Sequence, residues 1–260
     1  VASDIYSNKL ISWTARGTYA YKDRYMLTAT IRFDGSSRFG KDNKWGTFPS
    51  VGLAWRASEE DFMKDNKVIT DLKIRTSYGV TGNQEIGDYK SLAQLTSKPG
   101  DSGYTDGKDA ITGFYETVGN SKLKWESTKQ FDAGFDLSLF NRVYLNFDYY
   151  NRQTNDLLYN VPIPSTSGFT NVLSNVGKVS NYGIEFSASA DVYKSKDWKV
   201  TVGGNFTYNR NKIKKLYDGA DRVTVYDGTA GTGIARVLEV GQPVNGVYTY
   251  HSIGIIRTQE

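Results

Sequence analysis

Charged side chains recur on the polar positions of several alternating segments, and these are the residues with which the sequence could do chemistry. Arginines predominate in the first part of the chain and carboxylates in the second, in the order Arg16, Arg32, Asp34, Arg56, Arg75, Glu126, Asp132, Asp136, Asp148 and Glu185. Guanidinium and carboxylate groups can pair with one another, hold a charged partner or line the path of a polar substrate. Because the alternation puts them all on one wet face, we expect mutual salt bridges to be their main role.

Other kinds of chemical site lack their usual parts. The chain has no cysteine, which excludes cysteine nucleophiles, and only one histidine, His251, which excludes multi-histidine zinc sites and leaves a single imidazole for a serine triad or other histidine chemistry. Asp101, Asp106 and Asp109 share a glycine-rich segment but lack the ligand spacing of a calcium loop, so a solvated loop is favoured. The segment 231–233 lacks the third glycine of a nucleotide-binding turn. We therefore expect no catalytic residue, no metal site and no cofactor.

Composition narrows the class of protein further. The 260-residue chain has 32 basic and 28 acidic residues, and its net charge of +4 gives no reason to expect a nucleic-acid partner. No window approaches the roughly 18 consecutive apolar residues of a transmembrane helix. Aromatic residues nevertheless make up 14% of a chain whose mean hydropathy is -0.51.

Strict alternation of apolar and polar residues predicts β-strands with one apolar face. Tyr25, Leu27 and Ile31 alternate with polar residues directly after the short segment 22–24, which predicts a hairpin. The same pattern predicts strands over 12–21, 25–34, 50–56, 72–80, 131–139, 143–149, 184–192 and 198–206. A weaker pattern over 222–257 indicates one or two more.

The connections between these segments alternate in length. Short links occur at 22–24, 141–142 and 193–197. Long polar links occur at 35–48, 81–122, 159–175 and 207–232. Short turns at one end and long loops at the other are typical of outer-membrane barrels.

The link 58–71 is an exception to this alternation. Ser58 followed by Asp61 has the pattern of a capping box, which predicts a short helix from Glu59 to Lys64. We expect this link at the short-turn end, as a periplasmic turn.

The apolar face has the height of a hydrocarbon layer, since it is confined to about nine residues nearest each short turn. Aromatic residues mark both of its ends, with Tyr19, Tyr21, Tyr25, Tyr193 and Trp198 by the short turns and Phe33, Trp45, Phe48 and Tyr149 towards the long loops. The residues predicted to face lipid are Leu27, Ile31, Leu53, Phe135, Leu145, Phe147, Phe186 and Val200. A soluble β-sandwich would also alternate, but it explains the aromatic placement and the loop asymmetry less well.

Two sets of residues in the long links could meet partners. Tyr104, Phe114 and Tyr115 suit stacking on sugar rings or burial under a lid, of which lid contact or packing is favoured over direct substrate contact. The basic run Arg210, Lys212, Lys214 and Lys215 could meet lipopolysaccharide phosphates, although a solvated loop is the favoured interpretation.

Several motifs follow one another in the order of a known family. They are Tyr21-Lys22-Asp23-Arg24-Tyr25, Asp34-Gly35-Ser36-Ser37-Arg38-Phe39-Gly40, Trp45-Gly46-Thr47-Phe48-Pro49-Ser50, Ala54-Trp55-Arg56, Ser58-Glu59-Glu60-Asp61-Phe62, Ser77-Tyr78-Gly79-Val80-Thr81-Gly82-Asn83-Gln84, Trp125-Glu126, Asp156-Leu157-Leu158-Tyr159-Asn160-Val161-Pro162, Gly168-Phe169 and Asn181-Tyr182-Gly183-Ile184-Glu185. In this order the motifs resemble the C-terminal barrel part of the SusC/RagA-type TonB-dependent transporters of Bacteroidetes outer membranes, over about residues 9–256.

The resemblance implies an all-β fold, part of a roughly 22-stranded antiparallel transmembrane β-barrel, with about eight to ten of those strands present here. Residues 1–260 would then be a partial barrel domain, a fragment without the plug domain and the TonB box. Val1 opens the chain without a targeting signal, so we expect a segment of something longer.

The resemblance also implies a function. It implies import of large nutrients such as glycans, oligosaccharides or peptides across the cell outer membrane, with a SusD-like surface lipoprotein as lid and with TonB acting through the missing N-terminal part. Membrane lipid and lipopolysaccharide would surround the wall, and no covalent reaction would be catalysed. A passive porin or adhesin barrel and a secreted carbohydrate-binding β domain remain as alternatives.

The arginines pose a problem of charge if they stand side by side. Adjacent strands lie about 4.8 Å apart, so Arg16, Arg32, Arg56 and Arg75 can be neighbours only if carboxylates interleave with them. Asp34, two residues from Arg32, is one local partner. We expect the missing plug to supply the other acidic groups.

Overall fold

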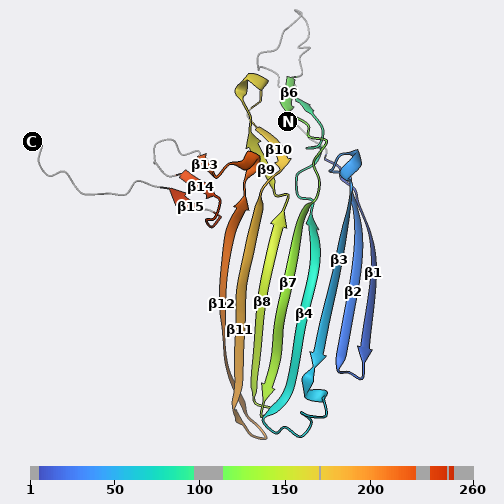
Figure 1. The fold of residues 1–260 in the computed structure, drawn as a ribbon, viewed down its shortest axis with the longest axis vertical. Helices are drawn as coiled ribbons and strands as arrows, with labels where there is room; N and C mark the ends of the chain where they lie inside the picture. Colours follow the sequence, from blue (N-terminus) through green and yellow to red (C-terminus); the bar gives the residue numbers. More distant parts are fainter. Residues whose placement is uncertain (1–5, 97–113, 170, 227–234, 245, 249–260) are drawn as a thin grey trace, which may run out of the picture.

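The structure is a computed structural model that describes residues 6–96, 114–169, 171–226, 235–244 and 246–248. Its centre is an eight-stranded sheet in the order β1-β2-β3-β4-β7-β8-β11-β12, in which every pair of neighbours is antiparallel (Figure 1). The strands are β1 (Leu10–Tyr21), β2 (Tyr25–Ser36), β3 (Trp45–Arg56), β4 (Ile69–Asn83), β7 (Glu126–Leu139), β8 (Val143–Asn155), β11 (Lys178–Lys194) and β12 (Lys199–Lys215). Within the described strands β1 and β12 are the two edges, so this sheet is open. The all-β prediction is confirmed.

The two tightest turns have the backbone geometry of hairpins. Between β1 and β2, Lys22 and Asp23 have φ of 50° and 53°. Between β7 and β8, Phe140 and Asn141 have φ of 54° and 52°. Positive φ at both central residues gives a turn whose twist matches that of the flanking strands. Apolar residues of the two flanking strands therefore stand opposite each other on the same face, as in Tyr21↔Tyr25 and Leu139↔Val143.

The long connections gather at the opposite end of the sheet from the short turns (Figure 1). They carry three small sheets, made of β5 (Gln94–Thr96) with β6 (Phe114–Thr117), β9 (Leu158–Pro162) with β10 (Asn171–Asn175), and β13 (Arg222–Tyr226) with β14 (Ala235–Glu239) and β15 (Gly246–Tyr248). The last sheet has three short strands, where the sequence indicated one or two. Single-turn 3-10 helices are η1 (Lys41–Asn43), η2 (Ala57–Glu59), η3 (Ser165–Ser167) and η4 (Tyr217–Gly219). None of the helices in the described ranges is long and apolar enough to cross a membrane.

Two of the predicted loops are too long. The link expected over 35–48 shrinks because β2 continues to Ser36 and β3 already begins at Trp45. The link expected over 207–232 shrinks because β12 continues to Lys215. The prediction followed the apolar face, but backbone hydrogen bonds between strands do not require apolar side chains. The strands therefore extend beyond the apolar band.

The helix predicted from Glu59 to Lys64 is wrong. Instead η2 ends at Glu59 and a series of turns follows, in which the amides of Met63 and Lys64 both donate to the carbonyl of Glu60. The capping box is also wrong, because the Ser58 hydroxyl donates to the carboxylate of Asp71 at 2.9 Å. A helix this short is unstable without caps, so side-chain anchors decide the local path of the chain.

The main hydrophobic core lies at the long-loop end rather than behind the sheet. Strands β3 and β4 pair from Arg56↔Lys73 only as far as Ser50↔Gly79. Beyond that point the strands are bridged by a cluster that we call the aromatic wedge, formed by Phe39, Phe48, Ile86, Leu123 and Trp125. Phe48 is 6% exposed, so its prediction as a membrane-surface aromatic is wrong. The ring packs against Trp125 with centroids 5.3 Å apart.

Candidate functional site

Strand register places all the charged residues predicted for the polar face on one side of the sheet. Arg75 of β4 stands opposite Gly134 of β7, which stands opposite Asp148 of β8, which stands opposite Glu185 of β11. Side chains on one strand alternate between the two faces, so every second residue from these positions shares their side. By this count Arg16, Arg32, Asp34, Arg56, Glu126, Asp132 and Asp136 lie there too. We call this side the charged face.

The centre of the charged face is an ion-pair cluster around Arg75. Its guanidinium lies 2.7 Å from Asp148 and 3.3 Å from Asp136. Asn146 donates to the same Asp136 carboxylate at 2.6 Å. The Arg75 side chain keeps about a third of its surface exposed (34%), so the cluster borders open space. Paired charges on a wet wall of this kind can hold a complementary polar surface without being a catalytic pair.

Polar side chains extend this cluster towards the loop end. Asp132 accepts hydrogen bonds from Ser77 at 3.1 Å and Gln130 at 2.8 Å, and Arg152 donates to Gln130 at 3.0 Å. Together they border a hollow of about 790 Å³ lined by Arg75, Ser77, Gln130, Asp132, Asp148, Tyr150, Arg152, Asn181, Glu185, Asn209 and Asn211. Glu185 has no hydrogen-bond or ion-pair partner among the described residues. The hollow could therefore accept cationic and hydroxyl groups from a partner.

The four arginines of the charged face do not stand side by side across their strands. Arg32 pairs with Phe48 in the register, whereas Arg56 lies at the other end of β3, so the two are far apart along the strand. Arg32 donates to Asp34 at 2.8 Å, which confirms the one local partner expected from the sequence. Arg56 lies 3.8 Å from Asp71, a partner that the sequence did not indicate. Three of the four arginines, Arg32, Arg56 and Arg75, thus have a carboxylate of this chain as neighbour. Arg16 has no ion-pair partner within the described part.

The opposite side of the sheet carries the predicted lipid-facing residues. They stand opposite one another along neighbouring strands, as in Leu27↔Leu53, Phe135↔Phe147 and Phe147↔Phe186. The rings of Phe135 and Phe147 stack with centroids 5.6 Å apart. Ile31, Leu145 and Val200 share this side by alternation. We call it the apolar face.

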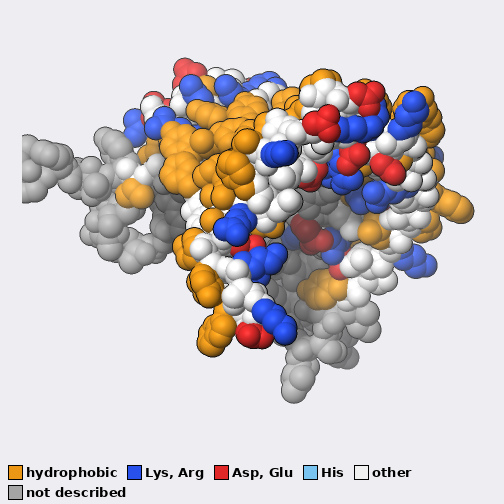
Figure 2. All heavy atoms as spheres, turned by 90° about the horizontal axis from the view of Figure 1, so that it is seen from below, with side chains coloured by type: hydrophobic (Ala, Val, Ile, Leu, Met, Phe, Trp, Pro, Cys, Tyr) orange, Lys and Arg blue, Asp and Glu red, His pale blue; other side chains and the backbone are white. Residues whose placement is uncertain are grey.

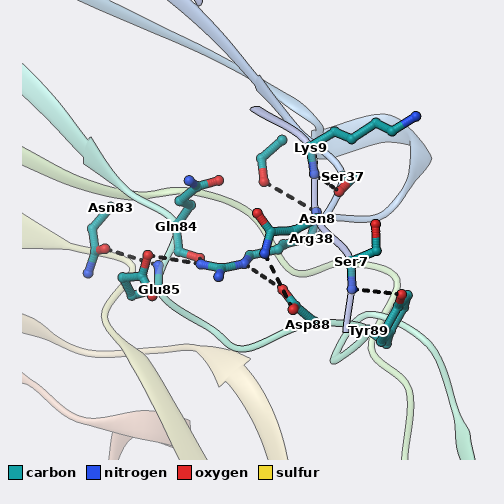
Figure 3. A network of polar contacts seen from close by, with 11 residues as sticks. Ser7, Asn8, Lys9, Ser37, Arg38, Asn83, Gln84, Glu85, Asp88 and Tyr89 are labelled. Atoms are coloured by element: carbon teal, nitrogen blue, oxygen red, sulfur yellow. Dashed lines mark hydrogen bonds and ion pairs between the residues drawn. The ribbon is translucent and has the colours of Figure 1, made fainter. Parts of the chain in front are cut away.

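The rim of long loops is held by an arginine that sequence reasoning gave no role. Arg38, from the link between β2 and β3, binds Asp88 and Glu85 at 2.9 Å each and reaches the carbonyl of Gln84 (Figure 3). Its side chain is 14% exposed. The hydrogen bond that Arg38 donates to the Asp88 carboxylate is the main cause that raises the pKa of Arg38 above its usual value, so its charge is permanent. Arg38 therefore ties the start of the β4–β7 connection to the β2–β3 link.

Neighbouring contacts extend this tie along the rim. Asn8 approaches Asp88 at 3.4 Å, and the Ser7 amide donates to the Tyr89 hydroxyl (Figure 3). Next to them the indole of Trp125 donates to the carbonyl of Lys44 at 3.0 Å. The motif containing Arg38 and Phe39 was visible in the sequence. Its contacts with residues some fifty positions away were not.

A second network holds the short-turn end. Glu60 accepts hydrogen bonds from the Tyr25 hydroxyl at 2.6 Å, from Arg24 at 2.9 Å and from the Trp55 indole at 3.1 Å. These bonds, Tyr25 first, lower the pKa of the Glu60 carboxyl. Figure 2 views the molecule from this end, where hydrophobic side chains gather in a patch and groups of charged side chains lie beside it. The motifs that contain Arg24 and Glu60, far apart in the sequence, are joined in one hydrogen-bond network.

Several residues named from the sequence lie outside the described residues, among them Tyr104, His251, the segment 231–233 and the three aspartates of the glycine-rich loop. Phe114 and Tyr115 begin β6, where they pair with Thr96 and Leu95 of β5. Among the residues that are described, no group of three or more acidic or histidine side chains could hold a metal ion.

The chain is similar to known proteins in both sequence and fold. Residues 4–247 match the family described as TonB dependent receptor-like, beta-barrel. The chain is 40% identical over 99% of its length to TonB-dependent receptor P39 of Formosa agariphila. It is 39% identical over 95% of its length to TonB-dependent receptor SusC of Bacteroides thetaiotaomicron. The chain spans only 24% and 25% of these two relatives.

Solved structures agree with these matches. The RagAB peptide transporter superposes with a TM-score of 0.80 at 35% identity, over 91% of this chain and 25% of that one. The FrpB iron transporter of Neisseria meningitidis, at 15% identity and a TM-score of 0.53, shares the fold alone. The comparisons confirm the SusC/RagA-type resemblance read from the motifs.

Proposed function

Because the chain belongs to the TonB dependent receptor-like β-barrel family, we propose that it forms part of the wall of an importer driven through TonB. The family is one of outer-membrane barrels, and this places the segment in the cell outer membrane. The observation that carries the proposal is the separation of the two faces. Apolar residues and charged residues of the same strands lie on opposite sides of one open sheet.

The two faces receive different partners in this proposal. The apolar face meets lipid, because a membrane strand must present apolar side chains across the hydrocarbon layer. The charged face meets the barrel interior, where it contacts the plug or lines the substrate path. The plug domain and the TonB box would lie in other parts of a longer protein, and residues 1–260 would be a partial barrel domain.

The ion pairs of the charged face change the charge that we expect on the plug surface. The sequence led us to expect acidic plug residues against a row of arginines. Arg32, Arg56 and Arg75 already have carboxylate neighbours, whereas Glu185 has none in the described residues. A surface that packs on the hollow would therefore add basic or hydroxyl groups near Glu185.

The cargo in this proposal is a large nutrient, a glycan, an oligosaccharide or a peptide. One relative is named SusC and one similar structure is called a peptide transporter, and both names are compatible with such cargo. A SusD-like surface lipoprotein would cover the long-loop end, where Tyr104, Phe114 and Tyr115 would contact the lipoprotein or the cargo. The work would come from TonB acting on the plug, and the chain would catalyse no covalent reaction.

The test uses the full-length protein in its own cells. Uptake of candidate glycans and peptides is measured in the parent strain, in a strain lacking this protein and in a strain lacking TonB. An importer loses uptake in both mutants. Uptake that survives loss of TonB would indicate a passive porin, and unchanged uptake with lost surface attachment would indicate an adhesin. Recovery of the protein in the medium without detergent would indicate a secreted carbohydrate-binding domain.

A further inference from the structure

The apolar face has an unequal distribution of charge. The acidic residues predicted for the polar face of the strands all lie on the charged face: Asp34, Glu126, Asp132, Asp136, Asp148 and Glu185. At the apolar-face positions of β7 and β12, charge appears only towards the long-loop end, and it is basic: Lys129, Arg210 and Lys212. All of them are exposed. A one-sided set of cations on a face that otherwise meets lipid needs an anionic partner at that level.

Strand register brings these cations to neighbouring levels on the wall. Lys212 of β12 stands opposite Ser180, which stands opposite Gln153, which stands opposite Lys129 of β7. One step nearer the apolar band, Arg210 stands opposite Tyr182. Lys129 and Lys212 are three strand spacings apart, about 14 Å. The set therefore covers a width greater than that of a single phosphate group.

The surroundings fit the boundary between hydrocarbon and headgroups. Arg210 lies over the ring of Tyr208 at 5.6 Å, and Tyr182 and Tyr208 are 39% and 43% exposed. Tyrosine is favoured where one end of a side chain is apolar and the other is wet. Below this level Phe186 and Phe206 stand opposite each other on the same face. The cations thus begin where the apolar band ends.

No carboxylate of the described residues forms an ion pair with Lys129, Arg210 or Lys212. The sequence favoured a solvated loop for the run from Arg210 to Lys215. That prediction is wrong, because β12 extends to Lys215. The alternation of the strand directs Arg210 and Lys212 to the same side, away from the acidic residues on the charged face. Their charge is therefore available to an external anion.

We propose that Lys129, Arg210 and Lys212 bind the phosphorylated sugar headgroup of a glycolipid in the outer leaflet. Arginine and lysine bind phosphate oxygens by charge-assisted hydrogen bonds. The hydroxyl groups of a sugar would meet Gln153 and Tyr182, which lie between the cations in the register. A headgroup with phosphates on a disaccharide fits the width of the site better than a phospholipid with one phosphate. The proposal rests on the membrane orientation given under the proposed function, and it does not depend on the cargo.

The test is a lipid-binding measurement on the full-length protein, purified and exchanged into nanodiscs of zwitterionic lipid. Three probes are titrated: phosphorylated lipid A, the same lipid A with its phosphates removed, and phosphatidylglycerol. We expect phosphorylated lipid A to bind at least about tenfold more tightly than either of the others, since each cation near an anionic headgroup contributes about fivefold in affinity. Binding should weaken as salt is raised.

Variants assign the binding to these side chains. K129Q/R210Q/K212Q should lose the preference for phosphorylated lipid A. The control K41Q/K67Q/K196Q removes the same number of charges away from the apolar face and should keep it. K129R/K212R should also keep it, because the charges remain. Heat-dependent mobility on gels checks folding. If the triple variant does not fold, the comparison of phosphorylated and dephosphorylated lipid A on the parent protein still tests whether the phosphates are recognised.

Two results would overturn the proposal. One is equal binding of phosphorylated lipid A by the parent and the K129Q/R210Q/K212Q variant. The other is equal binding of phosphatidylglycerol and lipid A, which would indicate a surface for any anionic lipid. If the protein binds phosphorylated lipid A but its deletion leaves nutrient uptake unchanged, that result would contradict the proposed transport function and not the lipid site.

Discussion

The guanidinium of Arg75 on β4 lies 2.7 Å from the carboxylate of Asp148 on β8, although strand β7 runs between them. The residue of β7 at that level is Gly134, which stands opposite both. A side chain there would fill the space through which the arginine reaches. The ion pair therefore braces three strands of an open sheet and depends on a glycine in the strand between.

Gly134→Ala is expected to weaken this brace. The added Cβ would collide with the Asp148 carboxylate and with the carbonyl of Phe147. Overpacking of this kind costs about 1–3 kcal/mol, measured as the free energy of unfolding of the full-length protein in lipid vesicles. Gly17→Ala is the matched control, since nothing lies within 4 Å of its Cβ position. An equal effect of both substitutions would contradict the role of Gly134.

Phe186 and Ser187 are neighbours on β11 but belong to opposite faces. We expect Phe186→Arg to cost about 2–4 kcal/mol in folding free energy and Ser187→Arg to cost little, because only the first puts a charge into lipid. Denaturant titration in vesicles measures both. Spin labels at Phe186 and the other apolar-face positions should prefer oxygen to a water-soluble quencher. The reverse preference would show that the two faces are assigned the wrong way round.

The pH dependence of the short-turn end follows from Glu60. Its pKa is lowered from the ordinary value of 4.5 by hydrogen bonds from Tyr25 and Trp55. A carboxyl with a lowered pKa in the folded state contributes stability above its unfolded pKa and loses it as the pH falls through the folded value. Trp55 fluorescence should therefore change below about pH 4.5.

Glu60→Gln should remove that transition and make the segment 57–68 more sensitive to protease at neutral pH. Glu59→Gln is the control, because Glu59 is the neighbour of Glu60 in the sequence but accepts none of the hydrogen bonds from Arg24, Tyr25 and Trp55. A fluorescence transition that persists in Glu60→Gln would assign the pH effect to another group.

Arg38→Gln should loosen the rim of long loops. The substitution removes two ion pairs and leaves Asp88, 11% exposed, without its cation. Hydrogen bonds to charged groups contribute roughly 1.5–3 kcal/mol, so hydrogen exchange over 84–93 should accelerate. Arg38→Lys should be intermediate, because lysine cannot donate to Asp88 and Glu85 in the same planar arrangement. Unchanged exchange in Arg38→Gln would contradict the role of this tie.

Topology gives a test on intact cells. The segment 58–71 spans the link between β3 and β4 at the short-turn end, and Lys122 belongs to the connection between β6 and β7 at the long-loop end, where the long connections gather (Figure 1). Trypsin added from outside should reach Lys122 and spare Lys64 and Lys67 if the short turns face the periplasm. Cleavage at Lys64 or Lys67 alone would reverse the orientation.

The sequence by itself determined the strands of the wall and their two faces. Residues such as Leu27 and Phe147 can be assigned to a face because the side-chain period of a strand is two, which is a local property. The hairpin at Lys22 and Asp23 is local for the same reason. The order of the motifs sufficed to indicate the family.

Tertiary structure decided which residues meet across strands and at the rim. Arg75 meets Asp148 only because β7 presents a glycine at that level, and register cannot be read from alternation alone. Phe48 is buried and does not lie in the predicted aromatic belt, because β3 and β4 separate there and the aromatic wedge fills the space between them. Arg38 meets Asp88, and Arg24 meets Glu60, through chain connections that no local pattern describes. Lys212 became a wall residue because backbone pairing continues past the end of the apolar band.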